Sequence, residues 1–239
     1  MAKLSDFGPL KDYRTHKFQG DGLSAILLKR HKVLVLEHKI NEAEEIQLKA
    51  NGVYIIGEGE LFLSCIGIDG KKVIIDHLRE GSIFGDFDFD GLDEYEDGFL
   101  FIEPILKRKA TIYVFDKRDF LEGLLENPYL TAQIFSNFSH QFVSLVEKIE
   151  ALTFLNLKTR LIYELVRLGE PDSENSDMVR INFKITHEKL AQSAGAVRET
   201  VSKALADLKK EGLIFYDSNK NLIVNIQKIS QSVKSILLL

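Results

Sequence analysis

Cysteine is nearly absent from this sequence, since Cys65 is the only one in 239 residues. A single thiol cannot form a disulfide within the chain, and it cannot supply the four thiolates of an iron–sulfur cluster. Histidine is sparse too, with six residues that are scattered and show no spacing typical of metal ligands. We therefore expect no disulfide framework and no iron–sulfur cluster held within one chain.

Long apolar runs are also lacking. None approaches the roughly 20 residues that a membrane-spanning helix requires, and the N-terminal residues MAKLSDFG have no apolar signal-peptide core. These absences predict a cytoplasmic protein with no membrane partner. The length predicts one large or two modest domains, and 45% hydrophobic with 28% charged residues is ordinary for a globular chain.

Motifs of the common catalytic sites are missing as well. The sequence contains no G-x-S-x-G, no phosphate loop ending in Gly-Lys-Ser/Thr, and no thiol–base signature around Cys65. A small-molecule enzyme built on a cupin-like roll would need a metal-ligand cluster, which the sequence does not display. We therefore predict that the protein is not an enzyme.

The most informative stretch that is present runs from Ile185 to Ile214, and it predicts two short helices with a tight corner. Thr186 can cap the first helix, because its hydroxyl can accept from an unpaired backbone N–H. Leu190 then lies on the inward face. Gly195 suits the corner, since glycine adopts left-handed backbone angles freely. An apolar stripe with helical spacing predicts the second helix, and it consists of Val197, Val201, Leu205 and Leu208.

Long hydrogen-bonding side chains crowd the N-terminal end of this second helix. Stability alone does not require them there, whereas a recognition helix inserts that end into the major groove of DNA. Arginine can bind guanine O6 and N7, and glutamate can accept from cytosine N4. The alternative is an ordinary helical hairpin with a solvated charged face. The predicted base-reading residues are Arg198, Glu199, Ser202 and Lys203, and the predicted phosphate contacts are Thr186, Thr200 and Lys209.

This stretch resembles the helix-turn-helix of the CRP/FNR family of bacterial transcription regulators. The family's run reads approximately T-x-x-x-L-A-x-x-x-G-x-x-R-E-T-V-S-R-x-L-x-x-L-x-x-x-G-L-I. Lys203 stands where arginine is usual, which keeps the charge and loses the planar fork. Val197 stands where a capping Ser or Thr is common, so a weaker helix start is expected. The matching residues are Thr186, Leu190, Ala191, Gly195, Arg198, Glu199, Thr200, Val201, Ser202, Leu205, Leu208, Gly212, Leu213 and Ile214.

Charge is distributed unevenly along the chain, whose net charge is −5. Residues 1–153 carry 18 Lys and Arg against 26 Asp and Glu, whereas residues 154–239 carry 13 against 10. The basic share therefore lies with the helix-turn-helix. This asymmetry favours a DNA-binding C-terminal end joined to an acidic sensor end.

Short apolar runs alternate with turn signals between Ser24 and about Phe115, which predicts an antiparallel β-roll or barrel. The stretches Gly57 to Leu63 and Asp69 to Asp86 resemble the cyclic-nucleotide-binding-like β-roll of the same family. A cupin-like roll with no ligand would give the same pattern, so this fold alone decides no function. The apolar runs are Ala25–Leu28, Val33–Leu36, Val53–Ile56, Leu61–Ile66, Val73–Ile75 and Thr111–Phe115.

The residues after Gly85 bear on a cyclic-nucleotide ligand. In family members that bind one, Gly-Glu starts a short helix there and an Arg-Ser/Thr-Ala sequence holds the phosphate. Here seven carboxylates lie between Asp86 and Asp97, and such a field repels a phosphate. The basic residues 107–109 do not form the phosphate-binding pattern. We therefore predict that cyclic AMP is not the effector, and the effector's identity stays open.

The same acidic loop has the spacing of a calcium-binding loop, with a glycine at its bend. Two features argue against a calcium site: no helix pair flanks the loop, and its last carboxylate is the short Asp97. We expect a solvated acidic loop, with Phe87 and Phe89 turned inward, and no metal site. The candidate ligands would be Asp86, Asp88, Asp90, Glu94 and Asp97.

A long helix is predicted from Pro128, since proline suits a first helical turn. Its apolar residues repeat at spacings of three and four, as in a two-stranded coiled coil. A second stripe of Leu130, Ile134 and Val146 is predicted to face the β-roll. A helix buried in its own domain is the alternative, but a dimer would supply two reading heads related by a two-fold axis. The predicted dimer seam is Phe135, Phe138, Phe142, Leu145, Ile149 and Leu152.

Together these features predict an α+β protein with an N-terminal antiparallel β-roll, a long dimerisation helix and a C-terminal winged helix-turn-helix. We expect a homodimer that binds double-stranded DNA at a pseudo-palindromic site, and the resemblance implies RNA polymerase as a further partner. The rival interpretation is an effector-sensing protein-interaction module with a degenerate winged helix. The predicted segments are domains 1–126, 127–153 and 154–239, a hinge at Phe154–Asn156, a strand at Val179–Ile185 and a wing hairpin at Ile214–Val224.

Overall fold

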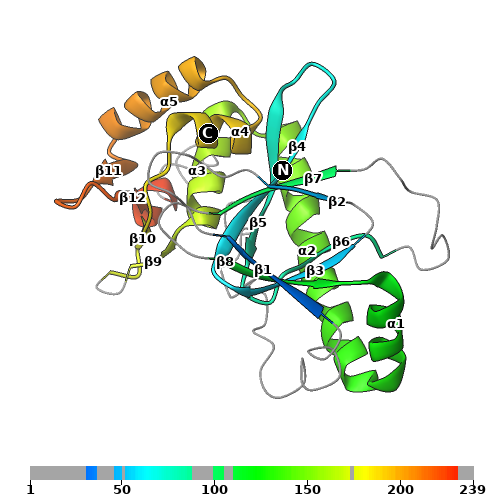
Figure 1. Ribbon diagram of the computed structural model, residues 1–239. Coiled ribbons are helices and arrows are strands. Elements are labelled where there is room, and N and C mark those ends of the chain that lie inside the picture. Colours follow the sequence, from blue (N-terminus) through cyan, green and yellow to red (C-terminus); the bar gives the residue numbers. More distant parts are fainter. Residues whose placement is uncertain are drawn as a thin grey trace. The chain divides into compact units, whose positions relative to one another are not determined.

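The computed structural model of the chain describes residues 31–36, 46–49, 52–87, 99–104, 110–172 and 175–230. These residues fall into two compact units, with the boundary between Val146 and Glu147. The elements of both units are labelled in Figure 1. Within the described part of the chain, no helix is long and apolar enough to cross a membrane.

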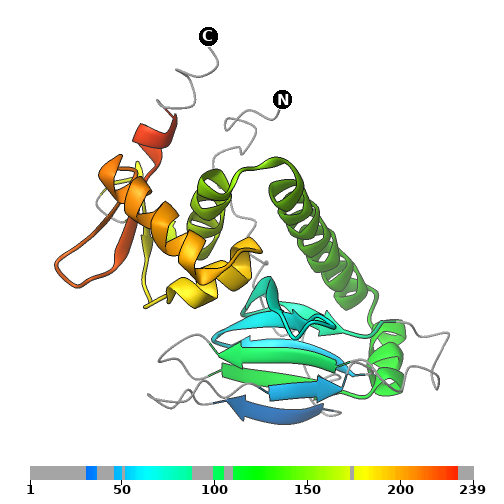
Figure 2. The same cartoon turned by 90° about the horizontal axis from the view of Figure 1, so that it is seen from above.

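Among the described residues, the N-terminal unit contains two four-stranded antiparallel sheets, with strand orders β1-β8-β3-β6 and β2-β7-β4-β5. Figure 1 labels these strands, and Figure 2 shows the same unit from above. This arrangement confirms the predicted antiparallel β-roll. The run Ala25–Leu28 lies outside the described residues. The strands are β1 (His31–Leu36), β2 (Ile46–Lys49), β3 (Val53–Glu58), β4 (Glu60–Ile66), β5 (Lys72–Arg79), β6 (Ile83–Gly85), β7 (Phe99–Pro104) and β8 (Ala110–Phe115).

Strand β3 is buried on both faces, because its side chains alternate between two cores. Tyr54 and Ile56 join residues of both sheets, such as Leu61 of β4 and Ile112 of β8, in the interior of the roll. The neighbouring Val53 and Ile55 belong to a second core that also contains residues of two helices, α1 (Lys117–Glu126) and α2 (Pro128–Phe154). That second core consists of Val53, Ile55, Ile83, Phe115, Phe120, Leu130 and Ile134.

Both helices of this unit begin with side-chain caps. The Asp116 carboxylate accepts from the Arg118 N–H at 2.9 Å, and the Asn127 amide oxygen accepts from the Leu130 N–H at 3.1 Å. Pro128 is the first residue of α2, as predicted, where its missing N–H removes no hydrogen bond. The buried Leu130 and Ile134 confirm two of the three members of the second predicted stripe of α2, since both pack in the core shared with the β-roll.

Among the described residues, the C-terminal unit contains helices α3, α4 and α5 and an antiparallel sheet of order β11-β12-β10-β9, and residues 226–230 are also helical. Strand β10 is shorter than the predicted Val179–Ile185, which is wrong beyond Ile181. The reason is pairing, since the ladder with β12 ends where Ile181 lies opposite Leu222. The elements are α3 (Leu157–Leu168), β9 (Glu170–Pro171), β10 (Met178–Ile181), α4 (His187–Ala194), α5 (Arg198–Lys210), β11 (Ile214–Tyr216) and β12 (Leu222–Asn225).

The last turns of α2 belong to this C-terminal unit. Helix α2 ends at Phe154 and α3 begins at Leu157, so the predicted hinge coincides with a break between two helices. Asn156 caps α3 by accepting from the Thr159 N–H at 3.1 Å, and the Arg160 guanidinium donates to the Leu152 carbonyl at 3.2 Å. Specific hydrogen bonds therefore hold the angle between these two helices.

Candidate nucleic-acid interface

Helices α4 and α5 form the predicted helix–corner–helix. The Thr186 hydroxyl accepts from the Lys189 N–H at 3.1 Å and caps α4, as expected. Gly195 closes α4 in the left-handed region at φ 60° and ψ 41°, where a residue with a Cβ is strained. Leu190 is fully buried, and α4 packs against both α3 and α5. The corner therefore fixes the direction in which α5 leaves the unit's core.

Helix α5 has one buried face and one exposed face. Val201, Leu205 and Leu208 are buried, which confirms three members of the predicted stripe. The predicted base-reading residues lie elsewhere on the helix: Arg198, Glu199 and Lys203 are exposed and Ser202 is half-buried. The structure therefore presents a charged surface at the start of α5, the end that a recognition helix inserts into a groove.

Val197 departs from the predicted stripe, because its side chain is 54% exposed. It is the N-cap of α5 and has an extended backbone at φ −100° and ψ 148°. The residue therefore precedes the first helical turn, and its side chain does not follow the helical repeat. Valine also makes no capping hydrogen bond, so the weaker helix start expected from the sequence is present.

Two hydroxyls near the start of α5 already donate to its backbone. The Thr200 hydroxyl donates to the Val197 carbonyl at 2.7 Å, and the Ser202 hydroxyl donates to the Arg198 carbonyl at 2.9 Å. Nδ1 of His187 lies 2.8 Å from the Ser202 oxygen, and it donates in that contact when the hydroxyl donates to the Arg198 carbonyl. Ser202 consequently retains an acceptor position, while Thr200 would have to rotate before it could donate to a phosphate.

The wing hairpin of β11 and β12 ends in a turn that is held by one carboxylate. Asp217 accepts from the Asn219 N–H at 2.9 Å and from the Asn221 N–H at 2.8 Å. Lys220 lies in this turn at φ 64° and is exposed, as are the other residues of its tip. Hydrogen bonds to Asp217 thus support a left-handed residue other than glycine.

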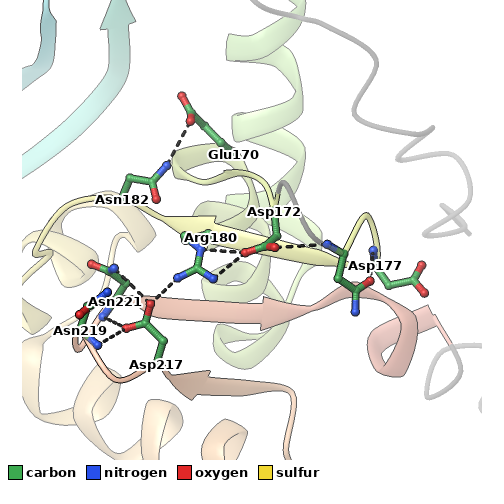
Figure 3. Close-up of polar contacts among 9 residues, drawn as sticks. Glu170, Asp172, Asp177, Arg180, Asn182, Asp217, Asn219 and Asn221 are labelled. Carbon is green, nitrogen blue, oxygen red and sulfur yellow. Dashed lines mark hydrogen bonds and ion pairs between the residues drawn. The ribbon is translucent and has the colours of Figure 1, made fainter.

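Arg180 connects this turn to the loop before β10 (Figure 3). Its guanidinium pairs with Asp217 on one side and with Asp172 on the other, where Nη2 lies 2.7 Å from the carboxylate. Partial burial acts to raise the pKa of Asp217, but hydrogen bonds from Asn221 and Asn219 and the charge of Arg180 outweigh it and hold the pKa below its ordinary value. The sequence analysis missed this cluster, although an Asp followed by Asn and Lys in a turn was an available signal.

Lys209 links the recognition helix to the wing. Its ammonium lies 5.5 Å from the centre of the Tyr216 ring, within cation–π range. Both residues are exposed. The Lys209 side chain, which we predicted to contact phosphate, therefore lies over Tyr216 of β11, the edge strand of the wing.

A buried ionic cluster connects α2, α3 and α4 within the C-terminal unit. Glu164 is 1% exposed and lies 3.5 Å from the Lys148 ammonium. The Ser193 hydroxyl donates to the other Glu164 oxygen, and Arg167 lies 3.8 Å from the same carboxylate. The last turns of α2 are thereby joined to the first helix of the helix-turn-helix. Sequence reasoning did not find this cluster.

The surface of α2 carries an exposed apolar stripe. Among the predicted seam residues, Phe135 is 73% exposed, Phe142 68% and Ile149 62%. Phe138 and Leu145 are half-buried, and the Phe138 ring packs edge-on against Phe87 at 4.3 Å.

Val146 was predicted to face the β-roll, and that prediction is wrong because the side chain is 38% exposed. It follows Phe142 by four residues and precedes Ile149 by three, so it shares their face of the helix. The exposed stripe of α2 therefore includes Phe135, Phe142, Val146 and Ile149, and the predicted seam residue Leu152 is also exposed, at 37%.

The acidic loop after Gly85 is described only at its start. Asp86 pairs with Lys117 of α1, so this carboxylate already has a cationic partner in the protein. Among the residues that the structure describes, no group of three His, Cys, Asp or Glu side chains could hold a metal ion. The other candidate ligands, Asp88, Asp90, Glu94 and Asp97, and the basic residues 107–109 lie outside the described residues.

Comparisons with known proteins match this geometry. Residues 159–231 match the family model of the Crp-like helix-turn-helix domain. The chain is 28% identical over 184 residues to the transcriptional regulator SdrP of Thermus thermophilus, covering 76% of this chain and 84% of that protein. It is 26% identical over 179 residues to the anaerobic regulatory protein of Bacillus subtilis, covering 74% of each chain.

Solved structures support the fold along most of the chain. A transcriptional regulator of the CRP/FNR family from Thermus thermophilus superposes with a TM-score of 0.60 at 20% identity, covering 85% of this chain and 98% of that one. At this identity the similarity concerns the fold alone. The sequence matches show that residues 159–231 are a Crp-like helix-turn-helix DNA-binding domain, and that most of the chain is similar to transcription regulators of the CRP/FNR family.

Proposed function

We propose that the protein acts as a homodimer that binds a pseudo-palindromic DNA site through α5. The observation that carries this proposal is the exposed, uncapped start of α5 beside its buried stripe. Arg198, Glu199 and Lys203 are exposed there, whereas the helix packs through Val201 and Leu205. A charged surface of this kind contributes little to stability and suits a major groove.

Base reading follows from the chemistry of these side chains. The Arg198 guanidinium can bind both acceptors of a guanine, and the Glu199 carboxylate can accept from a cytosine amine. Ser202 offers only an acceptor while its hydroxyl donates to the Arg198 carbonyl, so it suits the amine of adenine or cytosine. Lys203 adds a compact charge without a planar fork.

Phosphate contacts would hold the helix in register without reading sequence. The N–H groups at the start of α5 lack intrahelical acceptors, and Val197 supplies no side chain to them. Such groups bind phosphate oxygens well. Thr186, Thr200 and Lys209 are the side chains that we propose for the same task, with Thr200 turning away from its backbone acceptor.

Dimerisation is the second part of the proposal. The exposed stripe of α2 is apolar over several helical turns, and a second copy of the same helix would bury it. Two such chains place two reading helices about a two-fold axis, with half-sites about 34 Å apart on one face of DNA. A regulator bound in this way would act on RNA polymerase as its further partner.

DNA binding is tested by selecting bound duplexes from a random pool and measuring affinity by fluorescence anisotropy at several salt concentrations. We expect a pseudo-palindrome and an affinity that falls steeply with salt, because bound phosphates release counterions. Arg198→Ala should relax specificity at one G·C pair by roughly 1–3 kcal/mol. Arg118→Ala removes an exposed arginine from α1 and is the matched control. If no duplex is selected at low salt, the protein-interaction alternative replaces this proposal.

Dimerisation is tested by sedimentation of the full chain. Phe142→Asp places a charge in the centre of the exposed stripe and should yield a monomer. Ser136→Asp introduces the same charge at an exposed position of α2 off the stripe and should leave the dimer intact. An unchanged mass for the Phe142 variant would rule out this seam.

We also propose that cyclic AMP is not the effector. The residues after Gly85 lack the family's phosphate-binding pattern, and Asp86 takes the place of its glutamate and pairs with Lys117. Calorimetric titration of the full protein with cyclic AMP should give no heat of binding. Micromolar affinity would contradict this part of the proposal.

A further inference from the structure

Val197 has no role within the fold that explains it. As the N-cap of α5 it makes no side-chain hydrogen bond, although Ser, Thr, Asp or Asn at that position would stabilise the helix. Burial does not compensate for the loss, because the side chain is 54% exposed. The valine therefore neither caps nor packs, and residues that break a local rule in this way often serve a functional surface.

The backbone beside this side chain is held by hydrogen bonds. The Val197 carbonyl accepts from the Thr200 hydroxyl at 2.7 Å and from the Val201 N–H at 3.1 Å. A β-branched side chain has few rotamers, so the two methyl groups have few orientations before any partner arrives. Ordering the valine on binding therefore costs little conformational entropy.

Its neighbours are the residues assigned to base reading. Arg198 and Glu199 follow directly, and both are exposed. Among the four bases, only thymine presents an apolar group in the major groove, the methyl on C5. Small apolar side chains that contact this methyl distinguish thymine from cytosine.

We infer that Val197 is a specificity-determining residue that contacts the C5-methyl of one thymine in each half-site. The inference rests on the proposed DNA binding and adds a base that Arg198, Glu199, Ser202 and Lys203 do not read. 5-Methylcytosine carries the same methyl group and shares this chemistry, so the experiment must separate the two bases.

The test uses the full-length protein and the site that random selection returns. Each thymine of a half-site is replaced in turn by deoxyuridine, which removes only the methyl group, and affinity is measured by anisotropy at one salt concentration. Burial of one methyl-sized group predicts about fourfold weaker binding for one half-site and about fifteenfold for both. One thymine per half-site should show this effect.

Val197→Ser supplies the decisive comparison. Serine can cap the helix, so the variant should fold, and it should bind thymine and deoxyuridine equally at that position. Arg198→Ala should bind more weakly but remain sensitive to the methyl group. Cytosine placed at the same position should bind more tightly to the wild type once it is methylated, but not to the serine variant.

Several results would overturn the inference. A selected site without thymine, a wild type indifferent to deoxyuridine, or a serine variant that stays sensitive would each leave the proposed DNA binding intact and refute the role of Val197. A protein that selects no duplex at all would overturn the proposed function and this inference with it.

Discussion

Removing the carboxylate of Glu164 should destabilise the C-terminal unit more than most single substitutions. Glu164 and Lys148 are 1% and 4% exposed, and their charged atoms lie 3.5 Å apart. Glu164→Leu would remove the Glu164 counter-charge from the buried Lys148 ammonium. Breaking a buried ion pair on one side costs about 3–5 kcal/mol, which corresponds to a fall of about 12 °C or more in the melting temperature of a domain this size.

The reverse substitution should cost less. Lys148→Met leaves Glu164 with the Ser193 hydroxyl and with Arg167, whose guanidinium lies 3.8 Å away. The double variant Glu164→Leu/Lys148→Met replaces both charges with apolar groups of similar volume. It should recover about 1–4 kcal/mol relative to Glu164→Leu alone, because the Lys148 ammonium is no longer buried beside a missing carboxylate.

The measurement is urea unfolding followed by circular dichroism, with hydrogen exchange of α4 amides to assign the loss to the C-terminal unit. Glu150→Leu removes an exposed glutamate from the same stretch of α2 and is the control. A loss below about 1 kcal/mol for Glu164→Leu, or a double variant equal to the sum of the two single variants, would refute the reasoning.

Three further predictions concern the helix-turn-helix and the wing. Val197→Ser should raise the free energy of unfolding by about 1 kcal/mol in urea titrations, because the hydroxyl supplies the missing cap. Gly195→Ala should lower it by about 1–2 kcal/mol, since the backbone is left-handed at φ 60°, and Gly195→Asn should lower it less. The pKa of Asp217 in the folded protein is held below its ordinary value of 3.8. The ionised carboxylate therefore stabilises the fold at pH values above 3.8. This stabilisation is lost as the pH falls through the pKa of the folded protein. Wild type and Asp217→Asn should therefore converge in stability in acid, and parallel curves from neutral pH downward would contradict this.

The sequence predicted those elements whose signals are local. Thr186 marks the start of α4, Gly195 marks its end, and Pro128 is the first residue of α2. These positions could be predicted because caps and turns depend on residues a few positions apart. The buried faces of α4 and α5 followed from the helical repeat in the same way. The charged residues Arg198, Glu199 and Lys203 could be placed on exposed positions of α5 because they lie between the apolar residues of its buried stripe.

Interactions between distant residues could not be predicted in this way. Glu164 lies 29 positions from Ser193, and Arg180 lies 37 positions from Asp217. Periodicity marks which residues are apolar, but it does not say which polar residues meet across elements. Val197 was misplaced for a different reason, since an N-cap precedes the helix and its side chain lies outside the helical phase.

Helix α2 unites the two parts of the proposed mechanism. Leu130 and Ile134 lie in the core shared with the β-roll, whereas Lys148 is paired with Glu164 in the C-terminal unit. The boundary between the compact units falls within this one helix, after Val146. The exposed stripe from Phe135 to Ile149 crosses that boundary, so a partner helix that buried the stripe would contact both units of each chain. A change in how two such helices pair would therefore affect the β-roll unit and the unit that contains α5 together. It would not require movement at the capped junction between α2 and α3.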